Sequence, residues 1–357
     1  MRVETLRLKV NAGDLESEAA REAIARAAGI LRAGGTVAFP TETVYGLGAN
    51  ALDAEAVKKI FAAKERPGWD PLIVHVGRRA LVTAVAEEVS QDAHRLMEAF
   101  WPGPLTLLVP RHPRIPALVT AGLERVGVRM PAHPVAAALL RAAGVPVAAP
   151  SANRFGRASA TTAEHVAEDL AGRIDAILDG GETTHGVEST VVEAREDGCV
   201  VYRPGVITLE QIRAVCGGTV ILREGLKEEE PTALPAPGMG SRHYAPRARM
   251  VLIDGEGAEQ MDALARAVRD CEAAGERVGV MLAEGFESAV AGREARVWRW
   301  GRWADAEELA RRLFAGLRAL DAEGVTAIVC PLPAAEGVGL AVRDRLVRAG
   351  RRSQGIG

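Results

Sequence analysis

The strongest constraint in this sequence is a repeated alternation between amphipathic helical segments and short apolar runs. Apolar residues recur at helical spacing in residues 16–33, and Gly34 and Gly35 then end the pattern, as glycines commonly do after a helix. Short apolar runs follow, among them residues 37–39 and 72–76. Helices alternating with strands predict an α/β fold.

The alternation is interrupted once. Residues 224–248 contain an acidic run, several prolines and little periodicity, which indicates a linker. From residue 249 strand and helix patterns alternate again, which predicts a parallel, Rossmann-like sheet of roughly 100 residues. We therefore predict a catalytic domain at 1–215, a linker or lid at 216–248 and a smaller domain at 249–350.

Composition excludes several classes of protein. The 357 residues are 48% hydrophobic and carry a formal net charge of −3, which argues against a disordered chain and against non-specific wrapping on nucleic acid. The net charge does not exclude a local basic groove on the surface. The first residues contain no apolar signal segment, and no run approaches about 18 apolar residues. We therefore expect a cytoplasmic protein with no membrane segment.

The four cysteines, Cys199, Cys216, Cys271 and Cys330, lie far apart in the sequence. They form neither a CxxC motif nor a metal-ligand spacing. We therefore expect a reducing cytosol and no structural zinc.

Several familiar signatures are missing from the sequence. There is no G-x-x-x-x-G-K-[ST] motif, so a nucleotide is not held by a P-loop. The GVGLAV segment at 337–342 does not match G-x-G-x-x-G. There is also no G-x-S-x-G and no HExxH.

Lys64 stands out because nearly all the cationic residues of this chain are arginines. In a helix over residues 54–64, capped by Asp53, Lys64 falls on the same stripe as Val57 and Ile60. An ammonium group at an apolar position needs either an exit to water or an anion. The stripe therefore makes Lys64 a candidate ligand for an anion.

Polar residues cluster in the loops that follow the predicted strands, where open α/β sheets place ligands. Each segment alone is also consistent with a polar turn or a surface charge, and a histidine placed like His75 is on its own more often a core residue. Together they predict a cavity rich in cations and hydroxyl groups, without a nucleophile–base pair. Such a cavity suits phosphoryl chemistry. The segments are PTETVYGLG (40–48), KERPGWDPL (64–72), VGVRMP (126–131), AAPSANRFGRASATT (148–162), GVESTVVEA (186–194) and YRPG (202–205).

In this order, the motifs resemble the YrdC-type domain of threonylcarbamoyl-AMP synthases over residues 10–215. APGMGSRHYAP and EGVGLAVRDRL are similar to the linker and C-terminal domain of the longer, two-domain synthases. The resemblance implies a twisted open-sheet YrdC-like N-terminal domain with a smaller Rossmann-like C-terminal domain.

The resemblance also implies an activity. The family joins L-threonine, bicarbonate and ATP into threonylcarbamoyl-AMP and releases pyrophosphate, for the synthesis of N6-threonylcarbamoyladenosine in tRNA. The expected enzyme is thus a nucleotidyltransferase. It would use Mg²⁺ carried by ATP and no tightly bound organic cofactor. Its product would pass to a tRNA threonylcarbamoyl transferase complex, and direct contact with tRNA is left open.

The family pattern assigns site residues to positions of this sequence. The Lys-x-Arg and Ser-x-Asn signature gives the catalytic residues Lys64, Arg66, Ser151 and Asn153. ATP binding is expected from these four and from Asp70, Arg125, Ser159, Arg203 and Ser241. Threonine binding is expected from Thr43, His75, Arg129, Ser189 and the backbone of Ala149.

Two positions depart from the family pattern. Asp70 stands where the family usually has asparagine, and a carboxylate there must meet the metal or turn away from the phosphates. Gly240 and Ser241 replace a lysine and an aromatic residue that the linker commonly carries.

Two other functions are consistent with parts of the sequence. One is a carbamoyltransferase that uses carbamoyl phosphate and ATP, although such enzymes usually carry further metal-binding modules. The other is an RNA-binding module that uses the concave face without catalysis.

Overall fold

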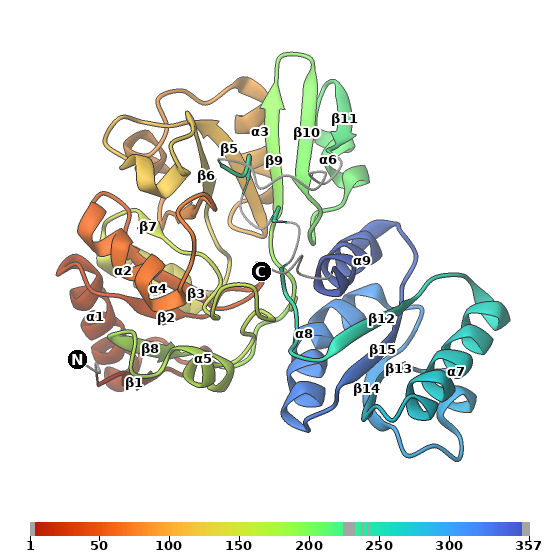
Figure 1. Cartoon of the computed structure of the whole chain (residues 1–357). Helices are drawn as coiled ribbons and strands as arrows, with labels where there is room; N and C mark the ends of the chain where they lie inside the picture. Colours follow the sequence, from red (N-terminus) through yellow and green to blue (C-terminus); the bar gives the residue numbers. More distant parts are fainter. Residues whose placement is uncertain (1–3, 224–232, 237–238, 241–242, 352–357) are drawn as a thin grey trace. The chain divides into compact units, whose positions relative to one another are not determined.

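The computed structural model describes residues 4–223, 233–236, 239–240 and 243–351. Within it the chain forms two compact units (Figure 1). The first consists of residues 1–155 and 159–240, and the second of residues 156–158 and 241–357. The boundaries expected at residues 215 and 248 stay predictions.

The first unit is built on a mixed sheet of eleven strands among the described residues. Its order is β1-β8-β2-β3-β7-β4-β6-β5-β9-β10-β11. The strands are β1 (Leu6–Lys9), β2 (Val37–Phe39), β3 (Gly46–Asn50), β4 (Ile73–His75), β5 (Leu105–Pro110), β6 (Arg125–Arg129), β7 (Val147–Ala148), β8 (Ala176–Asp179), β9 (Thr190–Arg195), β10 (Gly198–Arg203) and β11 (Thr219–Leu222).

Helices cover both faces of this sheet, and each face has its own core. Successive residues of a strand point to opposite faces. Accordingly Val37 and Phe39 pack with α1 and α4, whereas Ala38 packs with α2, α3 and α5. The helices are α1 (Glu18–Arg32), α2 (Ala54–Lys64), α3 (Gln91–Phe100), α4 (Pro134–Ala143), α5 (Ala163–Leu170) and α6 (Leu209–Val215), with 3₁₀ turns η1 (Arg79–Ala84) and η2 (Ala117–Thr120).

Helix α2 begins and ends where the sequence predicts. The Asp53 carboxylate accepts hydrogen bonds from the N–H groups of Glu55 and Ala56, at 2.9 and 3.2 Å. The helix ends at Lys64, because Glu65 adopts a left-handed conformation with φ of 55°. The predicted stripe on one face of the helix is confirmed too, since Val57, Ile60 and Lys64 are all buried.

The second unit contains a parallel sheet of four described strands in the order β12-β15-β13-β14. Both the α/β class and the small parallel sheet are therefore confirmed. Strand β14 was not expected from the sequence. The elements are β12 (Arg249–Ile253), α7 (Gly257–Ala273), β13 (Val278–Ala283), η3 (Glu287–Val290), β14 (Arg296–Gly301), α8 (Ala306–Ala322), β15 (Ala327–Pro331) and α9 (Gly337–Gly350).

Two of the four cysteines form a disulfide. Cys199 of β10 and Cys216, which follows α6, are bonded at 2.05 Å, with a sequence separation of 17. The cysteine spacing did not reveal this pairing, and the expectation of a reducing cytosol stays a prediction. The spacing failed because the chain returns to β10 through α6, which brings distant positions together. Cys271 and Cys330 are free and buried.

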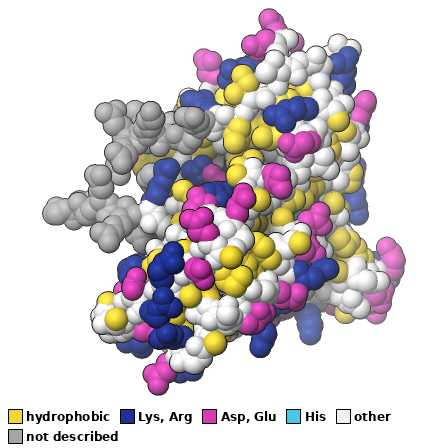
Figure 2. Space-filling model, turned by 90° about the vertical axis from the view of Figure 1, so that its right-hand side faces the viewer, with side chains coloured by type: hydrophobic (Ala, Val, Ile, Leu, Met, Phe, Trp, Pro, Cys, Tyr) yellow, Lys and Arg dark blue, Asp and Glu magenta, His cyan; other side chains and the backbone are white. Residues whose placement is uncertain are grey.

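Two further expectations concern surfaces and membranes. None of the helices in the described part of the chain has the length and apolar content needed to cross a membrane. Figure 2 shows positive and negative side chains interspersed over the face it presents, with apolar side chains between them. This face offers no single uninterrupted field of positive charge.

Candidate active site

The sheet of the first unit brings one group of the expected site residues to a single edge. Strands β4 and β6 are parallel, and their last residues, His75 and Arg129, are register partners. Strand β5 runs antiparallel to β6 and parallel to β9, so Thr106 and Ser189 lie at this same edge. Arg203, at the end of β10, lies next to them because β10 is antiparallel to β9.

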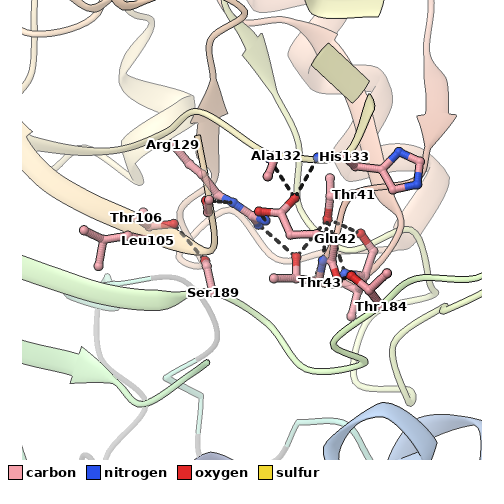
Figure 3. Close-up of polar contacts among 12 residues, drawn as sticks. Thr41, Glu42, Thr43, Leu105, Thr106, Arg129, Ala132, His133, Thr184 and Ser189 are labelled. Carbon is pink, nitrogen blue, oxygen red and sulfur yellow. Dashed lines mark hydrogen bonds and ion pairs between the residues drawn. The ribbon is translucent and has the colours of Figure 1, made fainter. Parts of the chain in front are cut away.

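Arg129 is buried and held on three sides (Figure 3). Its Nε donates to the carbonyl of Gly103 at 3.2 Å, and its Nη1 donates to Thr43 Oγ1 at 2.9 Å. Its Nη2 lies 2.7 Å from Oε1 of Glu42 in a buried ion pair. Burial raises the pKa of Glu42, but the charge of Arg129, its hydrogen bond and the backbone hydrogen bonds together outweigh this and hold the pKa below its usual range.

The hydroxyl groups of Thr41 and Thr43 form a short directed chain. Thr41 Oγ1 donates to the carbonyl of Val44 at 2.6 Å, and the two hydroxyl oxygens are 2.8 Å apart. Because a hydroxyl has one hydrogen, Thr43 is the donor to Thr41. Thr43 Oγ1 already accepts from Arg129, so toward a ligand Thr43 can only accept a further hydrogen bond.

Ser189 is the centre of a second polar cluster. Its carbonyl accepts from Nε and Nη2 of Arg203, at 3.1 and 3.0 Å, and its Oγ accepts from the same Nη2 at 3.1 Å. Thr106 Oγ1 lies 2.8 Å from Ser189 Oγ. All three side chains are buried. A cation and two hydroxyl groups are thus fixed beside Arg129.

His75 is a neutral side chain at this edge. Burial and then the nearby charge of Arg129 lower its pKa to about 3. Its ring packs edge-on against Phe39, with 6.2 Å between ring centroids. The described residues provide no hydrogen-bond partner for its Nδ1. The imidazole is therefore buried and uncharged.

A second group of expected residues is formed by two loops that are clamped together. The ammonium group of Lys64 donates to the carbonyl of Ser151 at 2.6 Å and to that of Asn153. In return, the N–H of Phe155 donates to the carbonyl of Lys64 at 3.0 Å. Glu65 also forms an ion pair with Arg154. The Lys-x-Arg and Ser-x-Asn segments therefore pack together as one cluster within the first unit.

Arg66 and Asp70 form a buried ion pair within this cluster. Arg66 Nη2 lies 2.9 Å from Asp70 Oδ1, and the side chains are 4% and 1% exposed, so both charges are withdrawn from water. Arg66 also donates to the carbonyls of Asp70 and Pro71, at 3.1 and 2.8 Å. Its guanidinium lies over the ring of Phe155, 5.9 Å from the centroid. The unusual carboxylate at position 70 is thus matched by its own arginine.

Known proteins match both parts of the chain. A family model described as "Telomere recombination" matches residues 29–205, and one described as "Threonylcarbamoyl-AMP synthase, C-terminal domain" matches residues 207–350. The chain is 43% identical to a threonylcarbamoyl-AMP synthase of Pyrococcus abyssi, over 90% of this chain and 92% of that protein. It is 45% identical to one of Bacillus subtilis, over 91% and 92%.

The chain belongs to the threonylcarbamoyl-AMP synthase family. A crystal structure of P. abyssi Sua5 complexed with L-threonine is similar to it, with a TM-score of 0.89 and 41% identity, covering 97% of this chain and 98% of that one. The resemblance inferred from the motifs is confirmed, as is the two-domain type of synthase.

The remaining residues that the synthase pattern singles out have different surroundings. Ser159 donates to Oε1 of Glu188, next to Ser189, so its loop is tied to the first group. The N–H of Ala149 donates to the carbonyl of Ile73 at 2.8 Å, which ties Ala149 to strand β4. Ser241 and Arg242 lie outside the described residues.

Arg125 is not brought to the other residues. It begins strand β6, whereas Arg129 ends it, which separates them by about 13 Å of strand. Its Nε pairs with Oε1 of Glu193 at 2.5 Å. The other synthase positions described here meet in one of the two groups.

Sequence reasoning missed several residues that hold the two groups of candidate site residues in place. The sequence motifs assign no role to Thr41, Glu42, Thr106 or Glu188, although Glu42 lies in the polar segment 40–48. Thr106 did give a signal, because it is the one polar residue inside the apolar run Leu105–Val109. Glu188 gave none, since its partner Ser159 lies 29 residues away.

Proposed function

We propose that this chain, as a threonylcarbamoyl-AMP synthase, condenses L-threonine, bicarbonate and ATP into threonylcarbamoyl-AMP and pyrophosphate in the first unit. The observation that carries the proposal is the clamp between Lys64 and the Ser151–Asn153 loop. It sets a buried cation at the family's signature loops, as recognition of phosphate groups requires.

The two groups of residues suggest a division of labour. We assign the phosphates of ATP to Lys64, Arg66, Ser151 and Asn153, with support from the Ser159 and Arg203 positions. Phosphate oxygens are recognised by such cations and by small donors. Asp70 contributes by balancing the charge of Arg66 rather than by touching the nucleotide.

We assign L-threonine to the group around Arg129. Arg129 has five N–H donors, and Gly103, Thr43 and Glu42 engage three of its nitrogens. The two N–H groups left on the terminal nitrogens suit a carboxylate. Thr43, as an acceptor, suits an N–H or O–H of the amino acid. The remaining contacts are His75, Ser189 and the carbonyl of Ala149.

The reaction needs no covalent enzyme intermediate. The amine of threonine attacks bicarbonate, forming the N-carboxylate and releasing water. An oxygen of this carbamate then attacks the α-phosphorus of ATP in line, the bond from the α-phosphorus to the bridging oxygen breaks, and pyrophosphate leaves. The protein's part is to hold the reactants in line and to neutralise charge on the phosphates.

We propose that Mg²⁺ enters with ATP as its counter-ion. Among the described residues, no group of three or more His, Cys, Asp or Glu side chains could hold a metal. The nearest carboxylates are engaged, Asp70 by Arg66 and Glu42 by Arg129. A hard cation that keeps water and phosphate ligands fits such a site.

The product defines the partners. A mixed carboxylic–phosphoric anhydride hydrolyses readily, so we propose direct transfer to a tRNA threonylcarbamoyl transferase complex in the cytoplasm. A carbamoyl-phosphate-dependent transferase is disfavoured, because residues 207–350 match the C-terminal domain of the synthases.

The test is pyrophosphate release measured with and without threonine and with and without bicarbonate. We expect release to require both, with threonylcarbamoyl-AMP detected by mass spectrometry. Serine serves as a matched control for the side-chain methyl group. Turnover that ignores threonine would contradict the proposal. Salt-sensitive binding of RNA without any turnover would favour the RNA-binding alternative.

A further inference from the structure

Glu42 is a buried side chain whose two oxygens are held by different parts of the chain. Oε1 pairs with Arg129 Nη2 at 2.7 Å, and Oε2 accepts from the N–H groups of Ala132 and His133, at 3.1 and 3.4 Å (Figure 3). The Glu42 carbonyl accepts from the N–H of His185 at 2.8 Å. The residue is 5% exposed. Both its backbone and its carboxylate are therefore fixed.

We propose that Glu42 is a positioning residue that aims the guanidinium of Arg129 at the carboxylate of L-threonine. This inference rests on the function proposed above. An arginine side chain has many rotamers, and holding one of them costs entropy. The fixed carboxylate of Glu42 and the hydroxyl of Thr43 select a single orientation before the substrate arrives. The unengaged N–H groups of Arg129 then point away from Glu42.

The same contacts argue against proton transfer by Glu42. A general base needs an oxygen that can reach the amine of threonine. Both oxygens of Glu42 are already engaged by Arg129 and by the backbone after β6. The adjacent guanidinium also keeps the carboxylate ionised. Glu42 therefore acts through Arg129 and does not touch the reacting atoms.

An amide cannot replace this carboxylate. The glutamine of Glu42→Gln has one oxygen and one NH₂ group. If the oxygen faces Arg129, the NH₂ group meets the N–H donors of Ala132 and His133. If it is reversed, the NH₂ group meets the guanidinium. Glu42→Asp keeps the charge, but it is one methylene too short to reach both partners.

Glu193 provides a matched control. It is also a buried glutamate, 1% exposed, and its carboxylate accepts from Tyr202 at 2.6 Å and from Arg195 at 2.7 Å. It pairs with Arg125, at the opposite end of β6 from Arg129. Glu193→Gln therefore removes a comparable buried charge outside the proposed threonine group.

The experiment compares wild type, Glu42→Gln, Glu42→Asp and Glu193→Gln in the full chain. The readouts are kcat, the KM for L-threonine and for ATP, and the thermal unfolding temperature. We expect both Glu42 variants to raise the KM for threonine about tenfold or more. A change of this size corresponds to the loss of one charge-assisted hydrogen bond. The KM for ATP should not change. Glu193→Gln should lower the unfolding temperature and leave both KM values unchanged.

The possible outcomes separate the explanations. An unchanged KM for threonine in a folded Glu42 variant overturns the inference. So does a parallel rise in both KM values, which indicates a general structural role, or a fall in kcat alone with loss of the acidic limb of the pH profile, which indicates a base. If Glu42→Gln does not fold, Glu42→Asp decides. A wild type that turns over without threonine contradicts the proposed function itself.

Discussion

The ammonium group of Lys64 lies 2.6 Å from the main-chain carbonyl oxygen of Ser151. The ammonium group is buried, with Lys64 1% exposed, and it brings a positive charge to this loop, which favours an anion nearby. The contact also fixes the position of the Ser-x-Asn loop relative to the C-terminal end of α2. Charge and loop position are therefore set by one side chain.

Lys64→Met should lower kcat/KM for ATP by about 100-fold, because the stem is kept while the charge near the phosphates is lost. The fold should remain, as methionine fills an apolar stripe well. The measurement is pyrophosphate release at varied ATP. The control is Lys59→Met on the same helix, where the ammonium donates to Gly34 at 2.7 Å. Equal effects of the two variants would rule out a phosphate role for Lys64.

Asp70→Asn installs the residue that the family usually carries. We expect the free energy of unfolding to fall by about 1–3 kcal/mol, because the buried guanidinium of Arg66 loses its ionised partner. The KM for ATP should not rise, since Arg66 keeps its hydrogen bonds to the carbonyls of Asp70 and Pro71. Urea unfolding and ATP kinetics test this. A large rise in KM would show that the carboxylate itself serves ATP.

The sequence predicted local structure well where one segment carries its own signals. Helix α2 has its cap and its apolar stripe within the twelve residues 53–64, so Asp53 and Lys64 were placed correctly. The cysteine pair shows the opposite case. Cys199 and Cys216 meet through a strand, a helix and a turn, and no local signal marks that approach.

The site shows the same division. Motifs identified Arg129 and Arg66, because cations at strand and helix ends are visible in a sequence. Their ion-pair partners differ in how easily a sequence reveals them. Asp70 is only four residues from Arg66, whereas Glu42 is 87 residues from Arg129. Such a pair depends on the order of strands in the sheet. Charge pairing across the sheet therefore required the structure.

His75 should make the stability of the protein depend on pH. Its pKa is about 3 in the folded protein and near 6.5 when unfolded, so between these values the unfolded state binds the extra proton. Stability therefore falls as pH drops below about 6.5. From pH 6.5 to 5 we expect wild type to lose about 1–2 kcal/mol more than His75→Gln. Identical losses in chemical denaturation of the two proteins would contradict a neutral, buried His75.

Reduction of the Cys199–Cys216 disulfide should destabilise the first unit. The bond closes a loop with a sequence separation of 17, and cross-links of this size contribute about 3 kcal/mol, chiefly by restricting the unfolded chain. We expect dithiothreitol to lower the free energy of unfolding of wild type by about this amount. The Cys199→Ala/Cys216→Ala double variant should be equally destabilised and insensitive to dithiothreitol. Because β10 also carries Arg203 at its end, the KM for ATP is measured alongside. A wild type as stable reduced as oxidised would show that the disulfide does not constrain this loop.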